Sequence, residues 1–222
     1  MSLELKQISV TIQSSPILRS INLSVGPGQR VGLIGRNGAG KTTVMRTIAG
    51  LARPVAGEIL FDGQPINKLS PDQRAGLGFG YMPEDRRLVP LLSVEENMLL
   101  PSWANKSIDG ATRIKMVYEL MPELVEMKAR KALQLSGGQQ KLVALGRALI
   151  AGSRLLYLDE PFEGVAPALS RRLTEVIASL QDQKLSILIA QSELNHANKL
   201  LDQECLIERG EIIRTTDVGA AV

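Results

Sequence analysis

The residues with the most specific chemical pattern form a glycine-rich loop, "GRNGAGKT", directly after the apolar run "VGLIG". The loop matches G-x-x-x-x-G-K-[ST], in which backbone N–H groups and a helix N-terminus surround phosphates. In this pattern Lys41 reaches the β- and γ-phosphates, Thr42 places its hydroxyl on Mg²⁺, and Thr43 can reach the α-phosphate. The alternative, a plain glycine-rich turn, is disfavoured because every fixed position is filled. The predicted nucleotide site comprises Gly35, Arg36, Asn37, Gly38, Ala39, Gly40, Lys41, Thr42 and Thr43.

Two carboxylates, Asp159 and Glu160, end the apolar run "LLYLDE". Ligands of α/β folds collect at the carboxyl ends of strands, so we expect both side chains to face the nucleotide. Asp159 is then the natural partner of Mg²⁺, usually through water, and Glu160 is placed to polarise an attacking water as a general base. Two solvated carboxylates at a strand end are the alternative, which the phosphate loop disfavours.

A second candidate anion site lies far from the first, in "LSGGQ". Ser136, Gly137, Gly138 and Gln139 begin a helical pattern with an apolar stripe. Read alone, Ser136 is a helix N-cap whose side chain accepts a bond from a backbone N–H. The two glycines, however, leave backbone amides open to a phosphate, which a cap does not require.

The rest of the pattern supplies the elements that position these residues. Strands are predicted over residues 3–10, 21–25, 30–35, 154–160, 185–191 and 203–214. Helices are predicted over residues 41–51, 109–124, 137–152, 166–183 and 194–201. Residues 53–66 are typical of a hairpin that turns at Asp62-Gly63. The late alternation of apolar strands with helices predicts a doubly wound α/β core. Residues 85–150 are then a helical insertion beside a core made of residues 1–84 and 151–222.

Composition limits the function classes. The chain has 222 residues and a net charge of only +3, with acids and bases interspersed, so we expect no nucleic-acid partner. One cysteine, Cys205, excludes an internal disulfide and suits a reducing compartment. Because the sequence has no signal-peptide pattern and no run of ~20 apolar residues, we expect a soluble protein that meets a membrane only through a partner.

The phosphate loop, "LSGGQ" and "LLYLDE", in this order, resemble the ATP-binding cassette (ABC) proteins over essentially the full chain. The resemblance implies a P-loop NTPase (RecA-like) core with a mostly parallel sheet, an N-terminal antiparallel β subdomain and an inserted helical subdomain. It implies that two cassettes, identical or different, stack head to tail around two ATP molecules. Ser136 to Gln139 would then bind the γ-phosphate held by the partner's Lys41, and hydrolysis would loosen the pair.

Within this family, "GRNGAGKTT", "YMPEDRRLVPLLSVEEN" and "DEPFEGVAP" resemble ATPase subunits of importers for branched-chain and other hydrophobic amino acids, amides or urea. Glu84 stands where the family usually has a glutamine directed toward Mg²⁺, and Gln191 where it usually has a histidine. Glutamine can donate to the γ-phosphate but cannot titrate near pH 7. Ile12 is nearest to the usual adenine-stacking aromatic, which predicts weaker or less selective base binding. Pro167 replaces an acidic residue of the loop after Glu160.

The resemblance also implies the partners. Residues 84–96 and the helical insertion would face permease subunits in the cell (inner) membrane, with a solute-binding protein beyond, which places this chain at the cytoplasmic surface. "LVPLLSVEENMLL" and Trp103 form either a docking groove or the insertion's own core. His196 is expected on a surface helix. The alternatives are the engine of an exporter or lipid translocator, a cassette that acts on DNA or ribosomes, and a clamp that barely hydrolyses.

Overall fold

The computed structural model describes residues 2–180, 185–192 and 200–218. Its strands are β1 (Leu3–Ile12), β2 (Ser15–Val25), β3 (Arg30–Ile34), β4 (Ala56–Phe61), β5 (Gln64–Pro65), β6 (Phe79–Met82), β7 (Leu155–Asp159), β8 (Ser186–Gln191), β9 (Gln203–Glu208) and β10 (Glu211–Asp217). Its helices are α1 (Lys41–Ile48), α2 (Pro71–Gly76), α3 (Val94–Ala104), α4 (Gly110–Leu120), α5 (Glu123–Glu126), the 3-10 turn Ala132–Gln134, α6 (Gly137–Ala151) and α7 (Pro167–Ser179).

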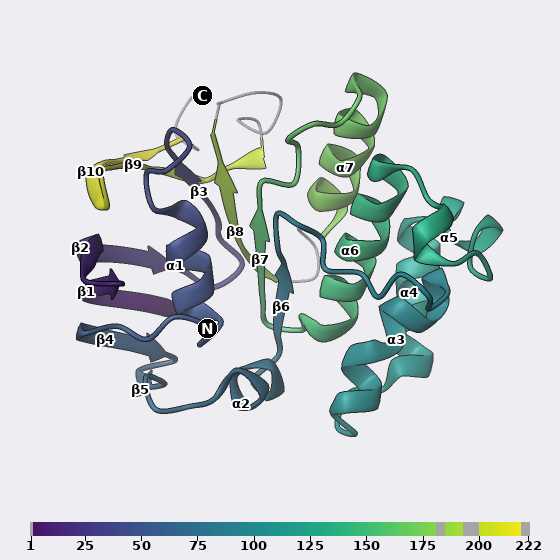
Figure 1. Cartoon of the computed structure of the whole chain (residues 1–222), viewed down its shortest axis with the longest axis horizontal. Coiled ribbons are helices and arrows are strands. Elements are labelled where there is room, and N and C mark those ends of the chain that lie inside the picture. Colours follow the sequence, from purple (N-terminus) through teal and green to yellow (C-terminus); the bar gives the residue numbers. More distant parts are fainter. Residues whose placement is uncertain (1, 181–184, 193–199, 219–222) are drawn as a thin grey trace.

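The strands form two sheets that lie on either side of α1 (Figure 1). One is antiparallel, in the order β2-β1-β4-β5, and the other has the order β10-β9-β3-β8-β7-β6. In the second sheet, β9, β3, β8, β7 and β6 pair in parallel and β10 adds an antiparallel edge. The predicted α/β class, with a mostly parallel sheet and an N-terminal antiparallel sheet, is therefore confirmed.

The two central strands are covered on both faces, as their uninterrupted apolar runs predict. Leu156, Leu158 and Ile189 pack with the helical side of the molecule. The alternate residues Tyr157 and Leu188 pack with α1 and the antiparallel sheet. Because both faces are buried, the register of β7 and β8 is fixed, and so are the side chains at their carboxyl ends.

The hairpin predicted to turn at Asp62-Gly63 is present between β4 and β5, and both turn residues have positive φ, 50° and 74°. The helix predicted over residues 41–51 ends earlier, at Ile48. Gly50, with φ 79°, reverses the chain, and the buried Arg74 guanidinium donates to the carbonyls of Thr47 and Ile48. The last residues of the helix predicted over 166–183 lie outside the described residues. So does most of the helix predicted over 194–201, including His196.

The short helix α2, the 3-10 turn, β6 and α3 were not predicted, and the last two have clear physical reasons. β6 contains Gly80, where a Cβ atom would lie 2.1 Å from the carbonyl oxygen of Ala148, so only glycine lets this strand meet α6. The helix α3 starts at a capping box in which Ser93 and Glu96 each bond the other's backbone N–H. Its Val94 and Met98 are buried.

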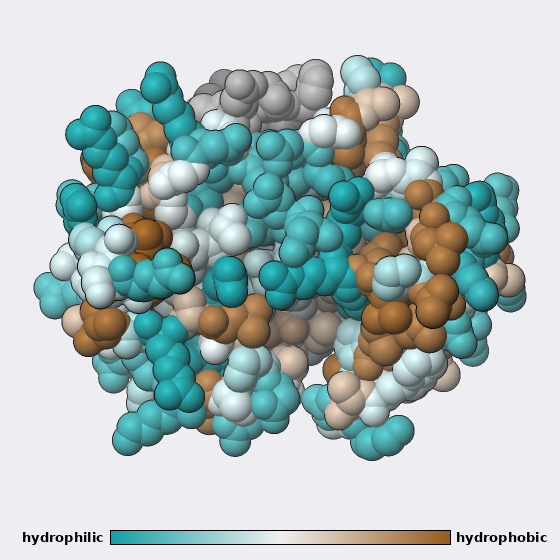
Figure 2. All heavy atoms as spheres, in the orientation of Figure 1, coloured by the Kyte–Doolittle hydropathy of each residue, from teal (hydrophilic) through white to brown (hydrophobic). Residues whose placement is uncertain are grey.

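The side of the molecule formed by α3, α4, α5 and α6, here called the helical side, has both buried and exposed apolar residues. Figure 2 shows apolar side chains gathered on this side of the molecule. Leu133 donates its N–H to the carbonyl of Pro90, which brings together segments whose Val89, Leu91 and Leu133 are all exposed. Trp103, near the end of α3, is 47% exposed. The segment that we expected to form either a docking groove or an internal core thus has some side chains in the core and others exposed, and the docking groove stays a prediction.

Candidate functional site

The phosphate loop connects the central strand β3 to α1. Gly40 has φ 112°, in the left-handed region that favours glycine, and a Cβ atom there would lie 2.8 Å from the Leu18 side chain. This turn lets α1 begin at Lys41, so that the free N–H groups of its first turn lie beside the loop. The loop and the helix start together form a cradle for anions.

Lys41 lies at the bottom of this cradle and is almost fully buried. Its Nζ atom donates to the carbonyl oxygens of Gly35, at 2.6 Å, and Arg36, at 3.2 Å. It also lies 3.0 Å from Oε1 of Glu160 and 3.1 Å from Oγ of Ser192. The cation is therefore held by the loop on one side and by a carboxylate on the other.

Glu160 is placed by the end of β7 and by the neighbouring strand. It has φ 50°, uncommon for a residue other than glycine, and its N–H donates to the carbonyl of Ala190, at 3.0 Å. Ser192 holds both carboxylate oxygens, because its N–H donates to Oε2 at 3.1 Å and its hydroxyl contacts Oε1. The sequence reasoning missed Ser192. Its position directly after Gln191, at the carboxyl end of β8, was the available signal.

Asp159 and Thr42 form a second polar pair. Thr42 Oγ1 lies 3.3 Å from Oδ1 of Asp159, and the Tyr81 hydroxyl lies 3.4 Å from Oδ2. Burial raises the pKa of Asp159 to about 6; the carboxylates of Glu84 and Glu160 add to the rise, while the bond from Thr42 opposes it. Oxygen donors are the ligands that Mg²⁺ prefers, so this pair fits that ion. Within the described residues no group of three His, Cys, Asp or Glu could hold a metal, so nucleotide or water oxygens would have to complete such a site.

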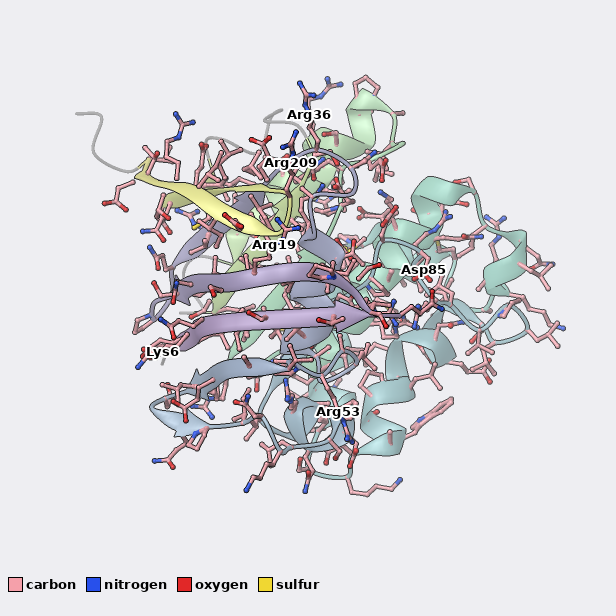
Figure 3. The ribbon with its side chains drawn as sticks, turned by 60° about the vertical axis from the view of Figure 1, so that its left-hand side comes forward. Lys6, Arg19, Arg36, Arg53, Asp85 and Arg209 are labelled. Carbon is pink, nitrogen blue, oxygen red and sulfur yellow. The ribbon has the colours of Figure 1, made fainter. Side chains whose placement is uncertain are left out.

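A cavity of about 500 Å³ opens over the cradle. Glu84 and Glu160 line it together with the loop. Glu84 also lines a neighbouring cavity that contains Thr42 and Asp159, so the structure brings Glu84 to both pairs. Ile12 does not line the cavity and is 46% exposed at the end of β1; Ile17, on β2, lines it instead. On the other side of the loop, Arg36 and Arg209 line a further hollow (Figure 3).

Gln191 ends β8 beside the loop. Its backbone carbonyl accepts the N–H of Gly35, at 3.2 Å. Its side chain is 5% exposed, and Oε1 is the buried side-chain oxygen for which the described residues supply no donor. A buried acceptor without a donor costs about 1–3 kcal/mol, which makes this amide ready to bind a donor such as water.

Ser136 caps α6 as the cap interpretation predicted. Its Oγ accepts the N–H of Gln139, and the Gln139 side chain accepts the N–H of Ser136. These residues are absent from the lining of the Lys41 cavity. Figure 1 shows α1 and α6 separated by the strands β8, β7 and β6, so the two candidate anion sites at the starts of these helices do not share one cavity in this chain.

The loop that carries Glu84 is tied to α6. Arg86 and Arg87 both have positive φ, 61° and 47°. Arg147, on α6, donates to both of their carbonyl oxygens, at 2.7 Å for Arg87. The Arg86 guanidinium in turn lies 3.4 Å from the carbonyl oxygen of Gly137. Hydrogen bonds thus join this loop to α6 at two places, Arg147 and the carbonyl group of Gly137.

Solved structures define the class of fold. The structure matches an ATP-binding cassette of an ABC transporter in its ADP conformation with a TM-score of 0.83 and 25% identity, covering 98% of this chain and 91% of that one. It also matches the fold of a dimeric bacterial ABC transporter cassette with a TM-score of 0.87, at 22% identity, covering 99% and 100% of the two chains. The fold is that of an ATP-binding cassette.

Sequence comparison then gives the family. Residues 18–163 match the family described as ABC transporter. The chain is 34% identical to the high-affinity branched-chain amino acid transport ATP-binding protein BraG of Pseudomonas aeruginosa, covering 92% of this chain and 88% of that protein. It is 31% identical to the lipopolysaccharide export system ATP-binding protein LptB of Haemophilus influenzae, covering 95% and 88%. The chain belongs to the ABC transporter family.

Membership makes this chain an ATP-hydrolysing enzyme, the ATPase subunit of an ABC transporter. Among the described helices, none combines the length and apolar character needed to cross a bilayer.

Proposed function

We propose that this chain powers solute uptake, of branched-chain or other hydrophobic amino acids, amides or urea, through separate permease subunits. The BraG relative, which is named for branched-chain amino acid transport, supports the amino-acid part of this substrate class. The LptB relative, at nearly the same identity, favours a second candidate, an exporter or lipid-translocating system. The ATPase mechanism is the same in both.

The observation that supports the mechanism is the ion pair between Lys41 and Glu160. ATP phosphates that enter the cradle would bind the loop N–H groups and Lys41, in competition with the carboxylate. Glu160, still held by Ser192, would then be free to accept the proton of an attacking water. Gln191 and Glu84 complete the proposed catalytic set, and Gln191 would bind the γ-phosphate by hydrogen bonding alone.

Thr42, Asp159 and Glu84 are the residues that we propose to hold Mg²⁺. When bound, the ion supplies positive charge that offsets the phosphates. Asp159 must be ionised for this role, although its pKa is raised. A cation beside it would favour the ionised form and lower that pKa.

The signature residues need a second cassette. Because Ser136 to Gln139 do not share a cavity with Lys41, we propose that they bind the γ-phosphate held in a partner subunit, either a second copy or a related ATPase. In this arrangement, residues 85–150 act as a helical subdomain beside the core. The docking surface for the permease would include the exposed Val89, Leu91 and Trp103.

Phosphate release and subunit mass test the ATPase mechanism. The purified wild-type chain, alone or with its companion cassette, is expected to hydrolyse Mg-ATP. Glu160→Gln is expected to lower turnover at least about 100-fold and to accumulate an ATP-bound dimer. Hydrolysis by the variant at the wild-type rate would remove Glu160 from its proposed role. A wild-type chain that binds ATP but releases no phosphate would support the clamp alternative.

Transport assays separate the two candidates. Co-purification from the membrane would identify the permease and any second cassette. With these in vesicles, the uptake proposal predicts ATP-dependent movement of leucine, an amide or urea toward the side that contains this subunit. Movement of lipid or solute away from this side would support the exporter instead.

A further inference from the structure

Lys141 lies on α6, one turn after the signature residues, and its ammonium group is buried. Its Nζ atom donates to the carbonyl oxygen of Glu160 at 2.8 Å and of Pro161 at 3.3 Å, and it contacts that of Glu163. The three N–H groups of the ammonium therefore match three backbone carbonyls of the loop that follows the proposed base.

This ammonium bonds to carbonyl dipoles rather than to a carboxylate. Within the part of the chain that the structure describes, no carboxylate oxygen lies within ion-pair distance of Nζ. Burial accordingly lowers the pKa of Lys141 below its usual value. The side-chain carboxylates of Glu163 and Glu160, which lie beyond ion-pair distance, partly oppose this effect. A buried charge is costly unless its hydrogen bonds are satisfied, so the loop and Lys141 constrain one another.

The contact closes a structural unit. α6 runs from the signature residues to Ala151, and β7 then runs back to Asp159. The start of α6 and the end of β7 therefore lie close together. Lys141 joins these ends directly, because it binds the carbonyl of Glu160 itself. The peptide at Glu160 has φ 50° and needs such support.

We propose that Lys141 is a positioning residue: its ammonium fixes the Glu160 peptide and the following loop to the signature helix. The inference rests on the proposed function of Glu160 as base. In a dimer, the signature residues would act on the partner's ATP while Glu160 acts on the ATP of its own subunit. Lys141 therefore joins the parts of one chain that serve two different nucleotides.

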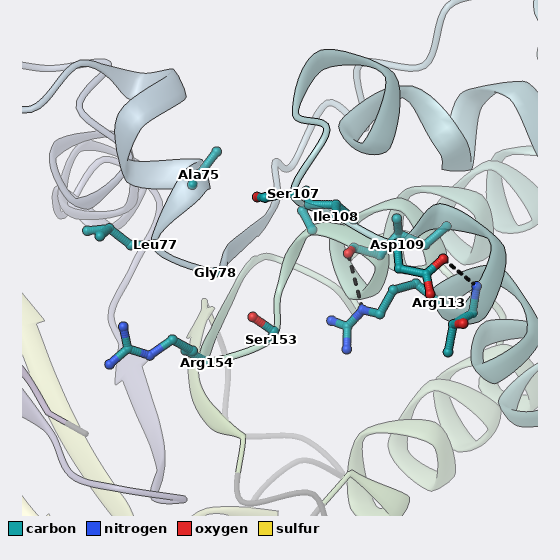
Figure 4. A pocket seen from close by; sticks show the side chains of 13 residues that line it. Ala75, Leu77, Gly78, Ser107, Ile108, Asp109, Arg113, Ser153 and Arg154 are labelled. Carbon is teal, nitrogen blue, oxygen red and sulfur yellow. Dashed lines mark hydrogen bonds between the residues drawn. The ribbon is translucent and has the colours of Figure 1, made fainter.

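A matched control lies at the other end of the same helix. Arg113 is a cation that also bonds three carbonyl oxygens, those of Leu149, Ile150 and Gly152. Figure 4 shows its guanidinium among the residues that line a pocket, and none of the signature residues lines that pocket. Arg113→Met removes a comparable carbonyl clamp from α6 without touching the loop after Glu160.

The test compares Lys141→Met and Arg113→Met with the wild type in phosphate release, in ATP binding and in thermal unfolding. We expect Lys141→Met to lower kcat at least about tenfold, with KM and the Kd for ATP changed less than about threefold, since the base is displaced but the cradle remains. Arg113→Met is expected to lower the unfolding temperature with kcat within about threefold of the wild type. If Lys141→Met does not fold, Lys141→Gln, which keeps two N–H donors, replaces it and is expected to lose at least about threefold in kcat.

Each outcome is decisive. A variant at Lys141 with wild-type kcat overturns the inference, and so does an equal loss of kcat in Arg113→Met. A loss of kcat/KM that comes entirely from higher KM and Kd values for ATP also overturns the inference, because the defect would then lie in binding. These failures leave the proposed function intact as long as the wild type hydrolyses ATP and Glu160→Gln does not. An inactive wild type would instead contradict the proposed function.

Discussion

Lys41 Nζ lies 3.0 Å from Oε1 of Glu160, and both side chains are about 95% buried. The residue that would hold the γ-phosphate and the residue that would activate water are thus bonded to one another. Neither group can perform its proposed role while the pair is intact, so ATP binding must exchange one anion for another at Lys41. This couples occupation of the phosphate site to release of the base.

The first prediction concerns the stability of this pair. Lys41→Met is expected to lower the free energy of unfolding by about 2–4 kcal/mol, because it leaves the Glu160 carboxylate buried without its cation. Adding Glu160→Gln to Lys41→Met is expected to recover part of this loss. Urea unfolding of the wild type, both single variants and the double variant measures the coupling. A coupling below about 0.5 kcal/mol would show that the contact contributes nothing specific.

The second prediction concerns Ser192. Ser192→Ala removes the hydroxyl that contacts Glu160 and Lys41 but keeps the backbone N–H bond to Glu160. We expect kcat for ATP hydrolysis to fall about tenfold with a smaller change in KM, since the carboxylate is less well oriented. Ser179→Ala is the control, because among the described residues the Ser179 hydroxyl bonds the Val176 carbonyl alone, near the end of α7. An unchanged kcat in Ser192→Ala would mean that the backbone bond alone orients Glu160.

The third prediction concerns pH. The pKa of Asp159 is about 6 in the fold and 3.8 as its ordinary value, so the folded state retains the proton over this interval. The contribution of this group to stability is therefore full below about pH 3.8 and is lost as pH rises through about 6. Asp159→Asn lacks this loss and is expected to be more stable than the wild type by about 1–2 kcal/mol at pH 7.5.

Urea unfolding at pH 4 and pH 7.5 measures this effect. The difference in unfolding free energy between Asp159→Asn and the wild type is expected to grow from pH 4 to about pH 6 and then stay constant. A difference that is equal at both pH values would contradict a raised pKa. Hydrolysis of Mg-ATP by the same variant is expected to be strongly reduced, so stability and activity change in opposite directions.

The fourth prediction concerns the base of the nucleotide. Ile12 offers no ring for adenine, and Ile17 is the apolar residue that lines the cavity. We expect only a modest preference for ATP over GTP. Ile12→Tyr is expected to tighten ATP binding about three- to tenfold if the β1 end covers the base. Ile213→Tyr, at an exposed isoleucine of β10, is the control. A strong ATP preference in the wild type would reject the expectation of weak selectivity.

Much of the fold could be predicted because its signals are local. The apolar runs of β7 and β8 and the Asp62-Gly63 turn each depend on a few consecutive residues. α3 was missed because no helix was predicted between residues 85 and 108, although the capping box of Ser93 and Glu96 marked its start. β6 was missed because its glycine is explained only by contact with α6, a segment distant in sequence.

The site could be predicted only in part, for the same reason. The loop pattern and the strand end identify Lys41 and Glu160, but not that the two form an ion pair. Ser192 and Lys141 carry no motif of their own. Their importance comes from side chains and carbonyl groups that the fold brings to them, and a single sequence does not contain this information.

Trp103 has a practical consequence. It is the chain's one tryptophan, and its indole is about half exposed near the end of α3. Indole fluorescence from this protein therefore originates at a single residue on α3, which does not line the cavity over the cradle. A blue shift on mixing with solubilised membrane components, beyond the emission that those components show alone, would signal that this point has been covered by a partner.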